Sequence, residues 1–191
     1  MRARDNPFRS ERVLSVRYRP PAGGWDALLA RFEALGRRAA IAGPHGSGKT
    51  TLLEDLAPRF RAQGHVVREL RLDTDAPRFD PEFLETFVAL LSPRDLILLD
   101  GAEQMGPLAW FAFRRRTRTA AGLLITVHRP GRLPTLLETR TSPELLACLV
   151  EEILGSRGKD LRPGIPALYE KHRGNLREAL RELYEDYAAA V

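Results

Sequence analysis

The chain has 191 residues, which is enough for one α/β domain with a buried core and a small appendage, but not for two full-sized domains. Its 43% hydrophobic and 29% charged residues are typical of a soluble globular protein, and no apolar run approaches the roughly 20 residues that a membrane span requires. The formal net charge of +5 comes from arginines spread along the chain, which excludes a single lysine-rich tail.

Residues 1–24 form an arginine-rich arm that ends in a turn rich in proline and glycine. The arm lacks the apolar stretch of a secretory signal, and the single cysteine, Cys148, excludes an internal disulfide. We therefore expect a cytoplasmic protein. The arm is expected to lie over the sheet; the alternative is that residues 6–9 and Tyr18 pack near a bound base.

Short apolar runs alternate with helical patterns between residues 25 and 141, as in a parallel sheet with crossover helices. The apolar runs predict strands at 38–42, 65–72, 95–100, 122–127 and 135–139. Helical spacing predicts helices at 25–35, 49–63, 81–91 and 108–118. The expected core is therefore an α/β domain with about five parallel strands and helices on both faces.

No strand pattern follows residue 141, and residues 142–191 are expected to form a helical subdomain. Ser142 as N-cap and Pro143 at the first helical position predict a helix that Gly155 ends. After a loop, two more helices are predicted at 167–172 and 175–190, the second opened by a capping box from Asn175 to Glu178.

Residues 43–50 match the phosphate-binding pattern G-x-x-x-x-G-K-[ST] between a predicted strand and a predicted helix. Its residues are Gly43, Pro44, His45, Gly46, Ser47, Gly48, Lys49 and Thr50, and Thr51 follows. The glycines let backbone N–H groups point at a β-phosphate, to which the helix N-terminus adds partial positive charge. Lys49 is predicted to reach the β- and γ-phosphates, and Thr50 to bind Mg²⁺. The segment therefore predicts a nucleotide site, with ATP and Mg²⁺ as cofactors.

The predicted strand 95–100 ends in a carboxylate, which predicts Asp100 as the second magnesium residue. Hydrolysis also needs a carboxylate or glutamine that orients the attacking water. Glu103 is the candidate and Gln104 the second choice, whereas the alternative is a solvent-facing pair in a turn. If neither residue acts, the chain binds ATP and cleaves it slowly or not at all.

With these motifs the chain resembles the AAA-type and related ATPases of the P-loop class over nearly its whole length. In these ATPases a glutamate often directly follows the magnesium aspartate, a position that Gly101 occupies here. The resemblance implies a three-layer P-loop NTPase fold whose core spans 25–141 and whose small C-terminal helical lid spans 142–191.

The resemblance also implies two further site residues. One is a polar residue at the end of the strand after the magnesium aspartate; Thr126 fits this position, and His128 competes with it. The other is a lid arginine at the γ-phosphate, which Arg177 matches, although Arg177 also fits a surface arginine in the first turn of a helix.

Oligomeric members of the class insert an arginine finger into the neighbouring site, so the resemblance allows a nucleotide-dependent homo-oligomer. Arg129, Arg132 and the arginines of 114–118 are candidates, between which the sequence does not decide. Residues 128–134 are also similar to a segment of bacterial, planctomycete-like P-loop ATPases, a similarity that implies no function.

The leading functional hypothesis is an ATP-dependent switch or ATPase acting on a protein partner, with no membrane role. A P-loop kinase whose 114–118 arginines close over phosphates is the second hypothesis. The third is a DNA-associated, ATP-dependent helper, because the arginines of 1–20 and 114–118 suit nucleic acid phosphates; they equally suit an acidic partner or bulk solvent. The absence of an N-K-x-D motif argues against a GTPase.

Overall fold

The structure is a computed structural model, and it describes Phe8 and residues 18–20, 23–155 and 158–189. The chain divides into two compact units. The sheet unit comprises Arg19–Gly43 and Lys49–Glu138. The helical unit comprises the described residues of Pro44–Gly48 and Thr139–Val191, together with Phe8 and Tyr18.

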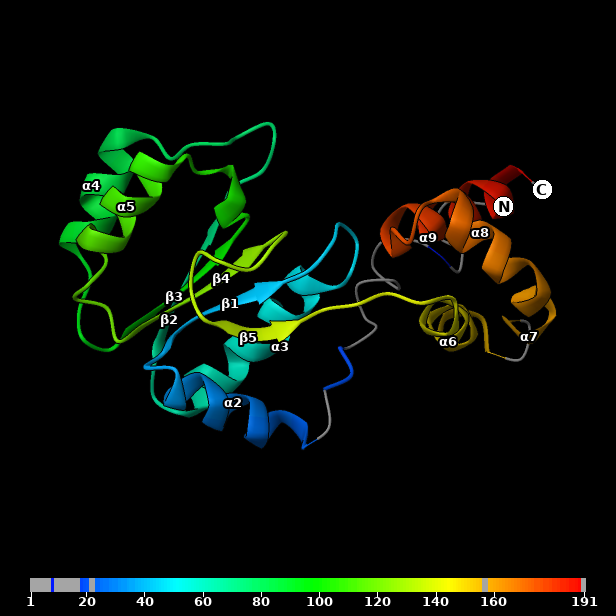
Figure 1. Cartoon of the computed structure of the whole chain (residues 1–191), viewed down its shortest axis with the longest axis horizontal. Coiled ribbons are helices and arrows are strands. Elements are labelled where there is room, and N and C mark those ends of the chain that lie inside the picture. The colour runs from blue at the N-terminus through cyan, green and yellow to red at the C-terminus, as the bar shows by residue number, and fades with distance from the viewer. Residues whose placement is uncertain (1–7, 9–17, 21–22, 156–157, 190–191) are drawn as a thin grey trace. The chain divides into compact units, whose positions relative to one another are not determined.

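Five parallel strands form the sheet in the order β2-β3-β4-β1-β5 (Figure 1). Their bounds are β1 Arg38–Ala42, β2 Val66–Arg71, β3 Asp95–Asp100, β4 Gly122–Val127 and β5 Thr135–Glu138. The predicted bounds of β1, β3 and β4 are confirmed, and β2 and β5 are slightly shorter than predicted. β1 and β3 are both neighbours of β4, so their carboxyl ends, which carry the predicted site, lie at one edge of the sheet.

Helices cover both faces of this sheet, which confirms the predicted three-layer α/β architecture (Figure 1). Helices α2 (Gly24–Ala34) and α3 (Lys49–Ala62) lie on one face, and α4 (Pro81–Ala89) and α5 (Pro107–Arg116) lie on the other. A 3-10 helix that the sequence patterns did not predict, η2 (Ala102–Gln104), follows β3 directly.

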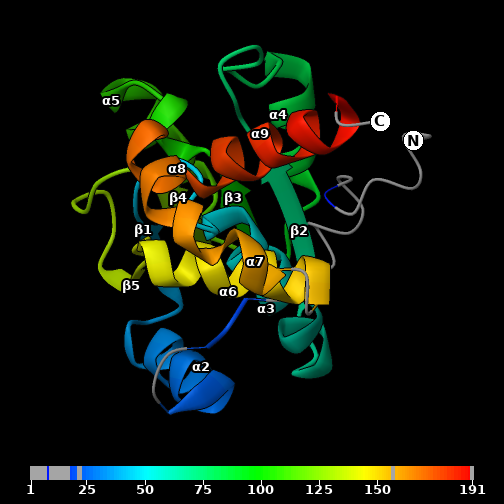
Figure 2. The same cartoon turned by 90° about the vertical axis from the view of Figure 1, so that its right-hand side faces the viewer.

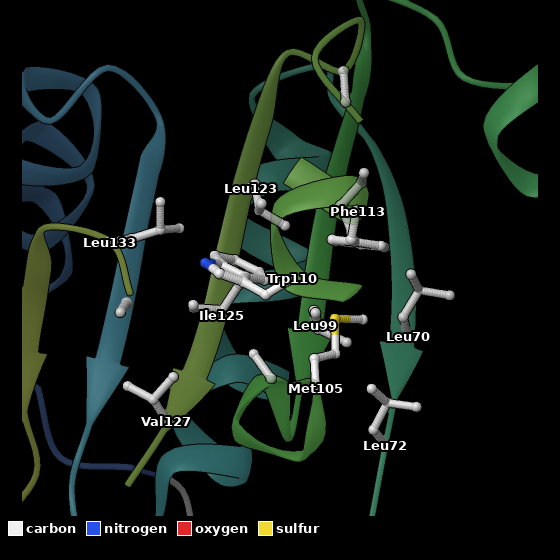
Figure 3. Close-up of a cluster of buried hydrophobic side chains, with 14 of the residues drawn as sticks. Leu70, Leu72, Leu99, Met105, Trp110, Phe113, Leu123, Ile125, Val127 and Leu133 are labelled. Carbon is white, nitrogen blue, oxygen red and sulfur yellow. The ribbon is translucent and has the colours of Figure 1, made fainter. Parts of the chain in front are cut away.

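The core between the sheet and α5 is built from side chains that alternate along the strands. Trp110 and Phe113 of α5 point at the sheet and belong to the same buried cluster as Leu99, Leu123 and Ile125 (Figure 3). Burying a large apolar side chain contributes roughly 1.5–3 kcal/mol.

The helical unit contains four α-helices and one short 3-10 helix among its described residues (Figure 2). Their bounds are α6 Pro143–Leu154, α7 Gly158–Leu161, η4 Arg162–Gly164, α8 Ile165–Lys171 and α9 Leu176–Ala189. The predicted N-cap is confirmed, because the Ser142 hydroxyl accepts a hydrogen bond from Leu145 N at 3.2 Å. Helix α7 was missed, since residues 156–166 were expected to be a loop. No described helix has the length and apolar character that crossing a bilayer would take.

The expected path of the arm over the sheet is wrong for Phe8, the one residue described in the first 17. Phe8 is buried in the core of the helical unit, where its ring meets that of Tyr187 edge-on with 5.3 Å between centroids. Most of the predicted arm 1–24, including Asn6, Pro7 and Arg9, lies outside the described residues. The aromatic side chain is therefore used for packing against α9.

Candidate functional site

The phosphate-binding pattern forms a curled loop between β1 and α3. Gly46 has φ 69° and Gly48 has φ 84°, backbone conformations that favour glycine. The Ser47 hydroxyl donates to Pro44 O at 2.8 Å and lies 2.6 Å from Thr139 Oγ1. Pro44 and His45 are exposed, and Thr51 is half-buried in the first turn of α3. The loop geometry therefore follows from its glycines and from the serine between them.

Lys49 begins α3, and its side chain reaches back to Gly43, the residue that follows β1. Its side chain is buried, and Nζ donates a hydrogen bond to Gly43 O at 2.8 Å. A buried ammonium group needs oxygen partners, because burying a charge without them is costly. The Gly43 carbonyl oxygen is one such partner of the Lys49 ammonium group.

The structure brings Thr50, Asp100 and Thr126 together in one hydrogen-bonded row at the carboxyl edge of the sheet. Thr50 Oγ1 donates to Asp100 Oδ2 at 2.9 Å, and Thr126 Oγ1 donates to Asp100 Oδ1 at 2.6 Å. Mg²⁺ takes oxygen ligands and usually combines one or two carboxylates with waters and substrate phosphates. A hydroxyl and a carboxylate oxygen this close fit such an ion, with Thr126 holding the far side of the carboxylate.

The backbone at Gly101, directly after Asp100, leaves no room for the glutamate side chain expected at this position. Its φ is 79°, and a Cβ placed on it would lie 2.0 Å from Leu72 O. Any side chain at this position would collide with the backbone that follows β2. The chain turns here into η2, so the next carboxylate is Glu103.

Glu103 lies in η2 and contacts His128, which follows β4. Glu103 Oε1 is 2.9 Å from His128 Nε2. Among the described residues, Glu103 Oε2 is a buried oxygen without a hydrogen-bond partner. Thr126 and His128 were the two candidates for the polar residue at the end of β4. They have different partners, because Thr126 contacts Asp100 and His128 contacts Glu103. Gln104 is half-buried beside them.

The Arg132 side chain contacts the backbone of the segment that follows β3 and the ring of Trp110. Its Nη2 donates to Met105 O and, at 3.5 Å, to Glu103 O, and its guanidinium carbon lies 5.4 Å from the Trp110 ring centroid. Burial lowers the pKa of Arg132, and the Glu103 carboxylate acts in the opposite direction. This side chain braces η2, which argues against Arg132 as an arginine finger. Arg129 is exposed.

The arginines of 114–118 lie at the opposite edge of the sheet from Asp100. Arg38, at the amino end of β1, donates to Thr117 O at 3.0 Å and to Ala120 O at 3.4 Å, which places the end of α5 at that edge. Thr50, Asp100 and Thr126 lie at the carboxyl edge. The structure therefore does not bring these arginines over the phosphates of the same chain, as the kinase hypothesis required.

Within the helical unit, the first turn of α9 lies against Gly46. A Cβ placed on Gly46 would lie 2.0 Å from Asn175 Oδ1 and 3.1 Å from Arg177 N. Asn175 Oδ1 also accepts a hydrogen bond from Glu178 N at 3.3 Å, so it caps the helix. Arg177 is exposed. The structure thus places the backbone of the predicted lid arginine beside Gly46 of the loop.

Two further residues accompany the site. Tyr18 lies beside Gly48, with a ring carbon 3.5 Å from where a Cβ would stand, and burial raises the pKa of Tyr18. Glu54 was missed by the sequence reasoning. Burial first, and then the charge of Asp100, raise the pKa of Glu54. Its position four residues after Thr50, on the same helical face, was the signal that could have revealed it.

Comparisons with known proteins agree with this arrangement. No protein-family model matches the chain. Over 59 residues it is 48% identical to the molybdenum import ATP-binding protein ModC of Mesorhizobium japonicum, a match that covers 29% of this chain and 16% of ModC. The structure is similar to domain III of the Thermotoga maritima replication initiation protein DnaA, with a TM-score of 0.54, 15% identity, and 90% of this chain and 88% of that one covered.

The structure is also similar to the RuvB Holliday junction branch migration motor of Thermotoga maritima, with a TM-score of 0.52 and 16% identity. That match covers 83% of this chain and 58% of the RuvB chain. The chain thus spans little more than half of RuvB and about a sixth of ModC. The order of the strands, the curled phosphate loop and these similarities show that the chain has the α/β fold of the AAA-type P-loop nucleoside triphosphatases.

Proposed function

We propose that this chain is a Mg²⁺-dependent ATPase that acts as a nucleotide-driven switch on a partner. The observation that carries the proposal is the hydrogen-bonded row of Thr50, Asp100 and Thr126, in which Thr50 comes two residues after the phosphate loop and the other two residues come from β3 and β4. A hydroxyl and a carboxylate in this relation are what a magnesium nucleotide requires of its site.

The backbone amides of residues 44–48 would bind the β-phosphate, with the N-terminus of α3 adding its partial positive charge. Lys49, whose Nζ donates to Gly43 O, would bind the β- and γ-phosphates through its ammonium charge. Thr50 and Asp100 would hold Mg²⁺, which when bound neutralises charge on the phosphate oxygens. Thr126 keeps the Asp100 carboxylate oriented by occupying its second oxygen.

Glu103 is the residue that we assign to the attacking water. One of its oxygens contacts His128, whereas Oε2 has no partner among the described residues and can accept a proton from water. Arg132 binds the backbone carbonyls of Met105 and Glu103 and so fixes η2, which carries the carboxylate. His128 and Arg132 are therefore positioning residues in this proposal.

The switch would work through α9. Asn175 and the backbone of Arg177 lie at Gly46, so a phosphate group in the loop would meet the first turn of α9. We propose that Arg177 contacts the γ-phosphate. Hydrolysis removes the γ-phosphate and so releases the first turn of α9, which changes the surface offered to a protein partner. A nucleotide-dependent homo-oligomer with Arg129 as the finger is compatible with this scheme.

The test is release of inorganic phosphate from ATP in the presence of Mg²⁺ and in the absence of any acceptor. Steady release that EDTA stops supports the ATPase. Phosphate transfer only after addition of a small acceptor would favour the kinase instead, and tight ATP binding without release would leave a binding protein.

A further inference from the structure

The outer face of α5 exposes apolar side chains that a folded domain usually buries. Leu108 is 86% exposed and Phe111 is 66% exposed. Helical spacing places both away from Trp110 and Phe113, the two buried residues of the helix. Figure 3 shows these two buried side chains against the sheet. Arg115 follows Phe111 by four residues and therefore shares its face. An aromatic ring and a guanidinium group thus share one helical face, and both side chains are exposed in the described part of the sheet unit.

Guanidinium groups crowd the end of the same helix. Its last turn and the residue after its cap carry exposed arginines at 114, 115, 116 and 118. Within the part of the chain that the structure describes, none of these four side chains forms an ion pair with a carboxylate. The carbonyl end of the helix offsets only part of this charge.

The layer beneath adds further positive charge. Arg38 donates to Thr117 O and Ala120 O, which ties the end of α5 to β1. Burial, and then the charges of Arg114 and Arg118, lower the pKa of Arg38. Asp95, a buried carboxylate at the amino end of β3, lies at the same edge of the sheet. Its two oxygens accept hydrogen bonds from Arg68 and Ser92. Among the described residues the patch therefore has no carboxylate counter-ion, and it suits a ligand with several negative charges.

We propose that this face of α5, residues 108–118, binds single-stranded nucleic acid, with Phe111 stacking on an unpaired base and the arginines contacting phosphates. Guanidinium groups match phosphate geometry with two parallel hydrogen bonds. Base stacking on an aromatic side chain is the usual partner of such contacts in single-strand binding. The surface lies at the amino edge of the sheet, so its role does not depend on the proposed ATP chemistry at the carboxyl edge.

The experiment measures fluorescence anisotropy of a labelled oligothymidylate with the full chain and no nucleotide. We expect the double variant Arg115→Ala/Arg118→Ala to bind more weakly and to show a shallower salt dependence, by about 0.7 in the log–log slope per lost phosphate contact. Phe111→Ala should weaken binding roughly 5- to 140-fold if it removes one stacked base. Because Phe111, Arg115 and Arg118 are exposed, these variants should keep the thermal unfolding midpoint of the parent chain.

Arg61→Ala is the matched control, since it removes one arginine from α3 on the other face of the sheet (Figure 1). It should leave the affinity almost unchanged. Absence of binding, or binding that neither Phe111→Ala nor the arginine pair reduces, would overturn the proposal. Equal affinity for duplex DNA would refute the stacking role of Phe111. Displacement by polyglutamate as effective as by unlabelled oligothymidylate would assign the surface to an acidic protein instead.

Discussion

Thr126 donates its hydroxyl hydrogen to Asp100 Oδ1 at 2.6 Å, so a residue inside one strand orients the carboxylate at the end of its neighbour. The same hydroxyl oxygen accepts a hydrogen bond from Gly101 N at 2.8 Å. A side chain that is 1% exposed thus links the Asp100 carboxylate to the turn that carries Glu103. Substitutions of Thr126 should therefore change both the free energy of unfolding and the affinity for nucleotide.

Thr126→Val should destabilise the chain by about 1–3 kcal/mol, because it leaves Gly101 N buried without its acceptor. It should also weaken Mg²⁺-ATP binding, since the Asp100 carboxylate loses its orienting donor. Thr126→Ser, which keeps the hydroxyl, should retain most of both properties. Urea unfolding and titration calorimetry measure the two effects, and equal losses in the two variants would contradict the role of the hydroxyl.

Lys49→Ala should weaken Mg²⁺-ATP binding more than tenfold, since a hydrogen bond to a charged group contributes about 1.5–3 kcal/mol. The fold should remain, because the hydrogen bond from Lys49 Nζ to Gly43 O joins two residues that are only six positions apart in the chain. Lys159→Ala removes an exposed lysine of α7 and serves as the control. An unchanged affinity of Lys49→Ala in calorimetry would refute the phosphate site.

Glu103→Gln should reduce ATP turnover by about 10²–10⁴-fold while leaving ATP affinity near that of the parent chain. The amide preserves size but cannot take the proton of the attacking water. Gln104→Ala tests the second candidate and is expected to keep turnover. Single-turnover phosphate release together with binding measurements decides between them, and an unaltered rate in Glu103→Gln removes this residue from the mechanism.

Gly101→Ala should destabilise the chain, by at least the roughly 1–2 kcal/mol that a left-handed conformation costs a residue with a Cβ. The approach to Leu72 O adds to that cost. Gly106→Ala is the matched comparison, because φ there is −64° and a Cβ would meet nothing within 4 Å. Chemical unfolding of the two variants should therefore give a large loss for the first and little change for the second.

Asp95→Asn should flatten the acid dependence of stability. Burial by itself would raise the pKa of Asp95, but hydrogen bonds from Ser92 and Arg68 outweigh it and hold the pKa below its ordinary value. The carboxylate therefore stabilises the fold above its unfolded pKa of about 3.9, and this contribution is lost as the pH falls through the lower folded value.

At neutral pH the Asp95→Asn variant should be less stable by about 1–3 kcal/mol, and the difference should shrink below pH about 4. Asp75→Asn, at an exposed loop position, is the control with the same change of charge. A constant difference between parent and Asp95→Asn across this range would contradict the assignment.

Several parts of the fold were predictable from local patterns. The bounds of β1, β3 and β4 coincide with apolar runs of five or six residues, because a strand buried on both faces needs no polar alternation. The phosphate loop was predictable for a similar reason: its glycines, lysine and threonine act through neighbouring residues in the chain. The Ser142 cap followed from one hydroxyl and one proline.

The sequence alone therefore determined the features that depend on residues adjacent in the chain. These features are the strands, the curled loop and the carboxylate that ends β3. Only the tertiary structure decided that Glu103 meets His128, that Leu72 O excludes a side chain at Gly101 and that Arg132 turns to the backbone of η2. These pairs join segments that are more than 20 residues apart, and the strand order β2-β3-β4-β1-β5 brings them together. Periodicity along one segment carries no information about which other segment will lie beside it.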